Sequence, residues 1–181
     1  MRALFVLFLS FSLLALHGCA TTIGKGADRR TQGAYIEDET IEDTANTRIK
    51  NKYKEKVHIN VSSYNRKVLI TGEVADDAVK TDISRIIGGV QNVTAINNEL
   101  VIGAQSSLSS RSGDGFTTSN VKMRLGDSGK EFRSELVKVV TENGTVYLMG
   151  LITRAEGAIA TDIASTSKGV KKVVPLFDYI D

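Results

Sequence analysis

The chain has 181 residues, enough for one medium domain or two small ones. Its 23 basic and 21 acidic residues nearly balance, so no overall field attracts nucleic acid, and any attraction to anionic lipid must be local. The single cysteine excludes an intramolecular disulfide framework.

The first 18 residues have the features of a bacterial lipoprotein signal peptide. Arg2 precedes an apolar run from Ala3 to Leu16, which is too short to span a bilayer. The sequence Leu16-His17-Gly18-Cys19 then resembles a lipobox, although His17 replaces the small residue usual there. Cys19 is therefore the predicted lipidation site, and several acyl chains would make the anchor effectively permanent. The alternative is an ordinary signal peptide followed by an incidental cysteine.

Residues 19–39 are small and polar and have no hydrophobic period, which predicts a lipidated N-terminal tether. Within them, Asp28–Gly33 has two interpretations. It is either a solvated linker or a segment that lies against the first domain.

Residues 40–104 predict a first folded domain. Thr40 is the expected helix cap, with Asp43 completing a capping box. One stripe of the helix then faces the core, formed by Ile41, Ala45, Ile49 and Tyr53. Two alternating strands with one buried face follow, and His58 lies opposite their valines, so we expect a solvated histidine. A second helix starts at Asp76 or Asp77 and stops at Gly88-Gly89, before a third strand over residues 93–102.

The outer face of the first helix is basic, with cations at Arg48, Lys50, Lys52, Lys54 and Lys56. This face is a secondary candidate for binding acidic phospholipid. The alternative is a solvated face whose cations complement the negative C-terminal end of the helix.

Residues 105–115 are rich in Ser and Gly and predict a flexible linker, and residues 116–181 then repeat the same order of elements. Thr117 or Thr118 starts a helix, and Asn143-Gly144 favours a two-residue hairpin turn. Thr153 and Glu156 form a capping box. Pro175 interrupts the last strand, which predicts an edge position because proline cannot donate to a ladder.

The two predicted domains are copies of one unit. Residues 65–74 return as 143–152, with Gly72 and Gly150 separated by 78 positions. The unit resembles the BON domain, a small αββαβ module of bacterial envelope proteins. The expected fold class is therefore α+β, with two tandem BON domains, each a small three-stranded mixed sheet packed against two helices.

The order of lipobox, tether and two such units resembles the dual-BON outer-membrane lipoproteins, in which a motif similar to Asp28–Gly33 occurs near the start. Ala20 fits this group, because Asp after the lipidated cysteine would retain a lipoprotein at the inner membrane. The resemblance implies a lipid-anchored, periplasm-facing position at the outer membrane. It also implies binding of anionic phospholipid by the second BON domain, enrichment at division sites and support of envelope integrity.

Catalytic chemistry is not expected. After cleavage the chain keeps one histidine, His58, and no free thiol, so a metal site of His and Cys ligands cannot be assembled. A nucleophile and base pair would have to use His58, which lies on a predicted strand opposite the buried valines. We expect no cofactor and infer a binding module. The alternative function is a periplasmic adaptor for outer-membrane assembly or cell-wall amidase-regulating proteins, with lipid contact only through its acyl anchor.

The lipid-binding candidates lie on the first helix of the second domain. Val121 and Leu125 form the core stripe, whereas Phe116 and Met123 fall on the opposite side. An apolar pair facing away from the core beside polar and cationic side chains is typical of a membrane contact. The flanking candidates are Asn120, Lys122 and Arg124, while Asp127 opposes binding. The alternative for Phe116 is a hydrophobic staple folded onto its own helix.

Overall fold

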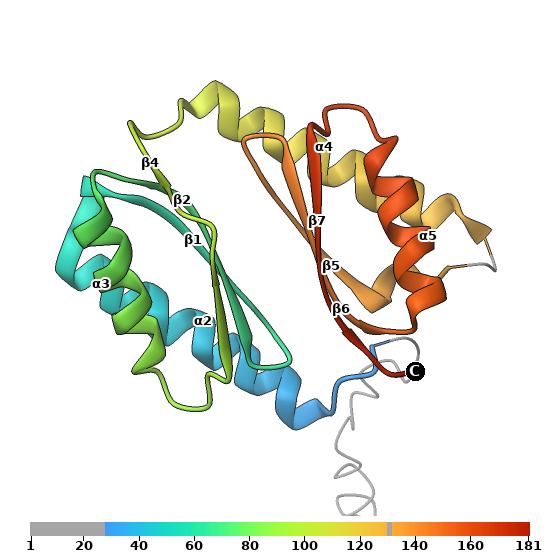
Figure 1. The fold of residues 1–181 in the computed structure, drawn as a ribbon, viewed down its shortest axis with the longest axis horizontal. Helices are drawn as coiled ribbons and strands as arrows, with labels where there is room; N and C mark the ends of the chain where they lie inside the picture. Colours follow the sequence, from blue (N-terminus) through green and yellow to red (C-terminus); the bar gives the residue numbers. More distant parts are fainter. Residues whose placement is uncertain (1–27, 130–131) are drawn as a thin grey trace, which may run out of the picture.

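The computed structural model describes residues 28–129 and 132–181. The predicted signal peptide, the lipidation site Cys19 and most of the tether lie outside the described residues. The rest of the chain forms two αββαβ units in tandem, which confirms the predicted fold class (Figure 1).

The first domain is built around the central strand β2. Helix α2 (Gln32–Tyr53) and a short 3₁₀ turn (Lys54–Lys56) precede β1 (His58–Tyr64), β2 (Lys67–Val74) and α3 (Asp77–Gly88). The predicted third strand is split into β3 (Ala95–Asn98) and β4 (Val101–Ile102). Strand β1 is antiparallel to β2, whereas β3 and β4 are parallel to it, so the sheet is mixed.

The second domain repeats this topology around β6. Helix α4 (Leu108–Asp127) and a 3₁₀ turn (Ser134–Leu136) lead into β5 (Val137–Glu142), β6 (Thr145–Ile152), α5 (Arg154–Ser165) and β7 (Lys172–Tyr179). Strand β5 is antiparallel and β7 parallel to β6. Pro175 lies on β7, at the edge of the sheet, as predicted.

The first helix of each domain begins earlier than the sequence predicted. Thr31, not Thr40, caps α2 and accepts a hydrogen bond from the Ala34 amide at 3.1 Å. Thr40 lies inside the helix and donates its hydroxyl to the Ile36 carbonyl. Likewise, Ser107 caps α4, so residues 108–115 are helical rather than a flexible linker. Tertiary contacts made by these early turns outweigh the roughly 1 kcal/mol by which each glycine disfavours a helix.

The other cap and turn predictions are confirmed. Asp76 caps α3 by accepting from the Val79 amide at 2.8 Å. Thr153 and Glu156 form the reciprocal capping box at the start of α5. At the β5–β6 turn, Asn143 and Gly144 have φ values of 51° and 77°, the positive values that a type I′ turn requires.

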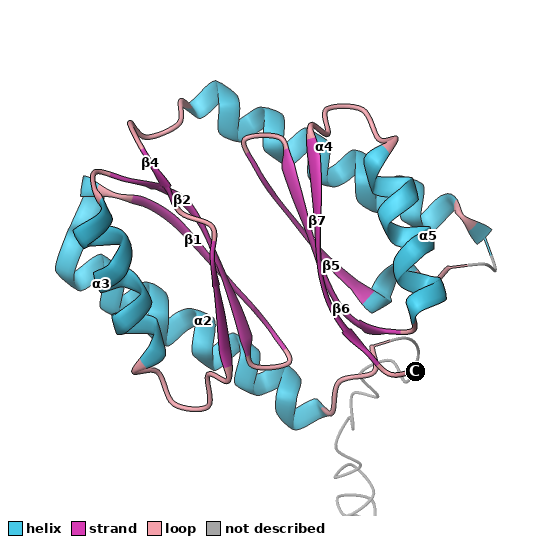
Figure 2. Ribbon diagram, viewed as in Figure 1, coloured by secondary structure: helices cyan, strands magenta, loops and turns pink. Residues whose placement is uncertain are grey.

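Each sheet is covered on one face by its own two helices and on the other face by the sheet of the other domain (Figure 2). Each domain has its own apolar core between its sheet and its helices. A third apolar cluster lies between the two sheets, where Tyr64, Leu69, Tyr147 and Met149 are each at most 5% exposed. The central strands β2 and β6, predicted to have one buried face, are therefore buried on both. Continuous apolar runs such as Val68–Ile70 and Val146–Met149 are typical of such strands, but they do not show which surface covers the second face.

The same packing corrects the prediction for His58. Its side chain is only 14% exposed, and its Nδ1 lies 2.9 Å from Glu73 Oε2. The second domain covers the face of β1 that the alternation had assigned to solvent.

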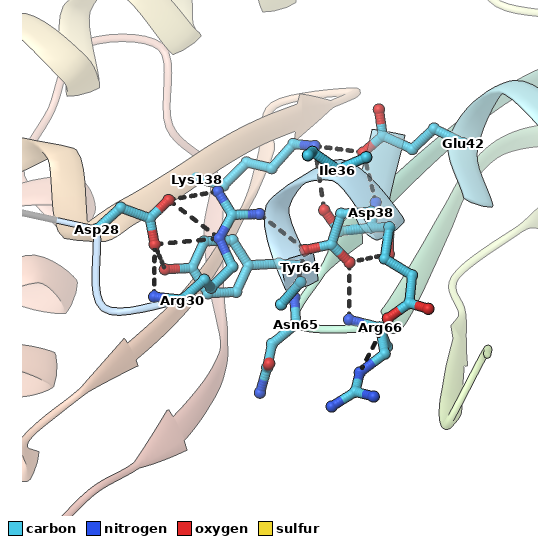
Figure 3. A network of polar contacts seen from close by, with 12 residues as sticks. Asp28, Arg30, Ile36, Asp38, Glu42, Tyr64, Asn65, Arg66 and Lys138 are labelled. Carbon is cyan, nitrogen blue, oxygen red and sulfur yellow. Dashed lines mark hydrogen bonds and ion pairs between the residues drawn. The ribbon is translucent and has the colours of Figure 1, made fainter. Parts of the chain in front are cut away.

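The segment before α2 connects both domains. Arg29 makes two hydrogen bonds of 2.6 and 2.8 Å to Glu156 of the second domain. Arg30 donates to Asp38 at 2.8 Å, and its guanidinium lies 4.0 Å from the centre of the Tyr64 ring (Figure 3). Of the two interpretations of Asp28–Gly33, contact with the first domain is the correct one, and the contact extends to the second.

Candidate membrane-binding face

Helix α4 turns one face into the core of the second domain. Val121 and Leu125 are fully buried there, as predicted, and pack with residues of β5, β6 and α5. The helix is consequently fixed in rotation, and the residues on its opposite side are fixed toward solvent.

The exposed side of α4 carries three large apolar residues, which we call the outer face of α4. Leu108 is 79% exposed, Phe116 74% and Met123 60%. Phe116 and Met123 were predicted to point away from the core. Leu108 was missed, because the sequence analysis placed it in a linker.

The staple interpretation of Phe116 is wrong. A hydrophobic staple joins the residue before a helix cap to one in the first turn. Since α4 begins at Leu108, Phe116 lies well inside the helix. Its exposure also shows that the ring is not folded onto neighbouring side chains.

The three polar candidates differ in their surroundings. Lys122 is exposed to solvent. Asn120 is half-buried and donates to the Lys168 carbonyl at 3.5 Å. Arg124 Nη1 donates to three oxygens at the end of α5, on Ile163, Thr166 and Ser167, at 2.9 to 3.0 Å. Arg124 therefore joins α4 to α5. Its Nη1 donates within the protein, so this nitrogen is not free to bind a lipid headgroup.

Two cations beside the outer face had no sequence signal. Lys168 and Lys171 line a shallow cavity of 590 Å³ together with Phe116 and Asn120. Both lysines are exposed. Within the described ranges, no carboxylate lies at ion-pair distance from either. They follow α5 in the chain and come beside α4 only through the tertiary fold.

Carboxylates near this cavity are largely occupied. Asp114 lines it, but its two oxygens accept from the amides of Asn143 and Gly144 at 2.9 and 2.8 Å. Asp127 is exposed at the end of α4 and remains the one predicted opposing charge on this helix. The outer face of α4 is thus an apolar ridge, formed by Leu108, Phe116 and Met123, that is bordered by lysines.

The basic face of α2 is a weaker candidate. Arg48 donates to the Gly89 carbonyl at 2.8 Å, and Lys52 pairs with Asp82 at 2.6 Å, so both hold α3 in place. The exposed large apolar residues of α2, Tyr35 and Ile36, lie at the opposite end of the helix. The cations of this face therefore have no exposed large apolar residue of α2 beside them.

Comparison with known proteins agrees with this architecture. The BON domain family matches residues 37–104 and 114–181, and the chain belongs to that family as a protein with two BON domains. It is 36% identical over 92% of its length to the outer membrane lipoprotein DolP of Haemophilus influenzae, covering 91% of that protein. It is 31% identical to the 21 kDa hemolysin of Actinobacillus pleuropneumoniae, over 84% of this chain and 79% of that one. It is also 30% identical to the osmotically-inducible protein Y of Escherichia coli, over 64% and 58% of the two chains.

The DolP relative is, by its name, an outer membrane lipoprotein, which agrees with the lipid-anchored position that the sequence implies for this chain. Among the described residues, no helix is both long and apolar enough to cross a bilayer.

Proposed function

We propose that this lipoprotein binds anionic phospholipid through the outer face of α4 and so supports envelope integrity, with enrichment at division sites. The observation that carries the proposal is the exposure of Leu108, Phe116 and Met123 on one helix, beside the lysines at 122, 168 and 171.

The energetics support binding that is specific for charge. Burying one of these apolar side chains in the bilayer interface stabilises the bound state by about 1.5 to 3 kcal/mol. Each lysine near an anionic surface contributes about 1 kcal/mol, and a neutral surface gives none of this. The apolar ridge supplies most of the affinity, and the lysines supply the preference for anionic lipid.

The anchor makes modest affinity sufficient. Eight residues lie between Cys19 and Asp28, so nine residue steps join them. At no more than about 3.6 Å per step, Asp28 lies at most about 32 Å from Cys19. A folded unit held so close to the bilayer meets lipid at high effective concentration. Arg29 is hydrogen-bonded to the first turn of α5, and α5 packs on α4. The segment that leads to the anchor therefore contacts the same domain that carries the outer face of α4.

The proposal is a binding role without catalysis, because the site consists of an apolar ridge and lysines and has no nucleophile paired with a base. A second candidate function is that of an adaptor for outer-membrane assembly or cell-wall amidase-regulating proteins. It is favoured by β4, where Val101 and Ile102 are 57% and 52% exposed on a strand paired with β2.

The test uses the soluble, unacylated chain from residue 20 to 181. It should co-sediment with phosphatidylglycerol vesicles more strongly than with phosphatidylcholine vesicles. Phe116→Ala should lose about 1 to 3 kcal/mol of partitioning free energy. Ile36→Ala is the matched control, because Ile36 is 54% exposed on the corresponding helix of the first domain and should leave partitioning unchanged. Absence of binding to anionic vesicles would favour the adaptor.

A further inference from the structure

The two ends of the interdomain interface have different chemistry, although the domains are copies. At the repeat shift of 78 residues, three ionisable side chains at one end correspond to three apolar or aromatic ones at the other: His58 to Leu136, Glu73 to Leu151 and Glu142 to Tyr64. At the second end, the Tyr64 hydroxyl donates to the Leu136 carbonyl at 3.3 Å. The carboxylates that cross the interface at that end are paired with cations, Glu156 with Arg29 and Glu42 with Lys138.

The three ionisable side chains converge on one point. His58 Nδ1 lies 2.9 Å from Glu73 Oε2 and 3.9 Å from Glu142 Oε1. One nitrogen or oxygen atom from each residue lies within 4.8 Å of the others. His58 and Glu73 come from neighbouring strands of the first domain, and Glu142 ends β5 of the second.

The two carboxylates of the set are buried, and His58 is half-buried. The side chains of Glu73 and Glu142 are 5% and 7% exposed. Among the described residues, neither forms an ion pair with Lys or Arg. Buried charges of this kind require a partner or a bound cation.

Neighbouring donors orient the two carboxylates. Glu142 Oε2 accepts from Asn60 Nδ2 at 2.9 Å and from Thr71 Oγ1 at 3.1 Å. Glu73 Oε1 accepts from Asn143 Nδ2 at 2.8 Å. These contacts hold one oxygen of each carboxylate and leave the other facing His58, where Glu73 Oε2 also accepts from the Ser106 amide at 3.0 Å. Outer hydrogen bonds orient metal ligands in this way.

The convergence point is reachable from solvent. His58 and Glu142 line a cavity of 570 Å³ between the two domains, together with Asn60 and Thr118. A small hydrated ion can therefore enter, and a water molecule can occupy a fourth position beside three protein ligands.

We propose that His58, Glu73 and Glu142 bind one divalent transition-metal ion, best matched by zinc, across the two domains. One imidazole nitrogen and two carboxylate oxygens suit zinc in a four-coordinate site completed by water. Magnesium and calcium prefer sites made wholly of oxygen. The expectation that the chain has no metal site considered only His and Cys ligands, and carboxylates supply the missing ones. This inference is independent of lipid binding.

The test titrates zinc chloride into residues 20–181, freed of any affinity tag and stripped with a chelator. Calorimetry should give one equivalent of bound zinc, and the melting temperature should rise with zinc but not with magnesium. His58→Gln and Glu142→Gln should each weaken zinc binding by about tenfold or more. Glu135→Gln, a change of the same type at an exposed site, should have no effect. Cobalt should give visible absorption bands of a four-coordinate site in the wild type, and these should be lost in both variants.

Melts without metal show whether each variant is folded. Wild type that binds no zinc, or variants that are folded and bind it unchanged, would overturn the proposal. A melting temperature that rises as the pH is lowered and does not change with zinc would also overturn the proposal. His58 would then act as a protonated bridge between the two carboxylates. Loss of the cobalt spectrum in folded Glu142→Gln would support it, since a purely structural role for Glu142 gives no such signal.

Discussion

Asp114 binds the β5–β6 turn in the same way that Asp38 binds the β1–β2 turn. Asp38 accepts from the amides of Asn65 and Arg66, both at 2.7 Å, and Asp114 accepts from the amides at the corresponding turn of the second domain. Both aspartates are buried, at 2% and 8% exposure, on early turns of α2 and α4. The early turns of each first helix are therefore part of the domain, because they hold its hairpin.

Asp38→Ala should be strongly destabilising. It removes the acceptor of two turn amides and of the Ser63 hydroxyl, and it leaves the Arg30 guanidinium without one of its two carboxylates. At about 1 to 3 kcal/mol for each buried group left unpaired, the free energy of unfolding should fall by at least about 3 kcal/mol in urea titrations. Asp127→Ala, at an exposed site, should change it by less than about 0.5 kcal/mol. Equal effects of the two variants would contradict this account.

The second domain should fold alone, and it should be more stable when the first turns of α4 are present. A fragment from Ser107 to Asp181 contains the cap of α4 and Asp114, whereas one starting at Phe116 lacks both. We expect cooperative thermal unfolding of the longer fragment and a lower melting temperature for the shorter one. The longer fragment should also self-associate in sedimentation experiments, because removing the first domain exposes Tyr147 and Met149. Identical melts of the two fragments would show that the early turns are dispensable.

The contact between Arg29 and Glu156 should make stability depend on pH in the acidic range. Hydrogen bonds from Arg29 lower the pKa of Glu156 to about 2. Because the folded value is depressed, the stabilisation is complete above about pH 4.5 and is lost as the pH falls toward 2. The pair is partly exposed, with side chains 33% and 22% accessible, so we expect no more than about 1 kcal/mol. In urea titrations, Arg29→Ala should differ from wild type more at pH 7 than at pH 2.5, where the remaining difference includes the pH-independent bond from Arg29 to the Leu151 carbonyl.

Lysine and arginine changes beside the outer face of α4 should act differently. Lys168→Glu and Lys171→Glu should weaken binding to anionic vesicles by about 1 kcal/mol or more each, and salt should reduce the difference as the Debye length shortens. Lys122→Glu should behave likewise. Arg124→Ala should instead lower the melting temperature, because it removes three hydrogen bonds to the end of α5. Weak binding to anionic vesicles by folded Arg124→Ala, at an unchanged melting temperature, would assign Arg124 to lipid.

Cys19→Ser should abolish acylation. Cys19 is the only thiol of the chain and directly follows the apolar run and Gly18. Cells grown with radiolabelled palmitate should label the wild type and leave the variant unlabelled and absent from the outer-membrane fraction. Label retained in the variant would rule out Cys19 as the acylated residue.

The sequence predicted what depends on neighbours along the chain. The Thr153 and Glu156 capping box, the Asn143-Gly144 turn and the buried Val121 all follow from local spacing, and all are confirmed. The errors have one physical origin. The start of α4 is helical because Asp114 binds a turn remote in sequence, and His58 is buried because another domain covers it. Lys168 and Lys171 belong beside Phe116 for the same reason, and single-chain periodicity carries no record of such contacts.

The packing of the two sheets pairs like with like. Leu69 and Tyr147 occupy the same position of the repeated unit, as do Thr71 and Met149, and all four are buried between the sheets. Contact between like positions is what a symmetric homodimer has. Here the two copies share one polypeptide, so the two ends of their interface need not be alike: His58, Glu73 and Glu142 meet at one end, and the corresponding positions at the other are Leu136, Leu151 and Tyr64.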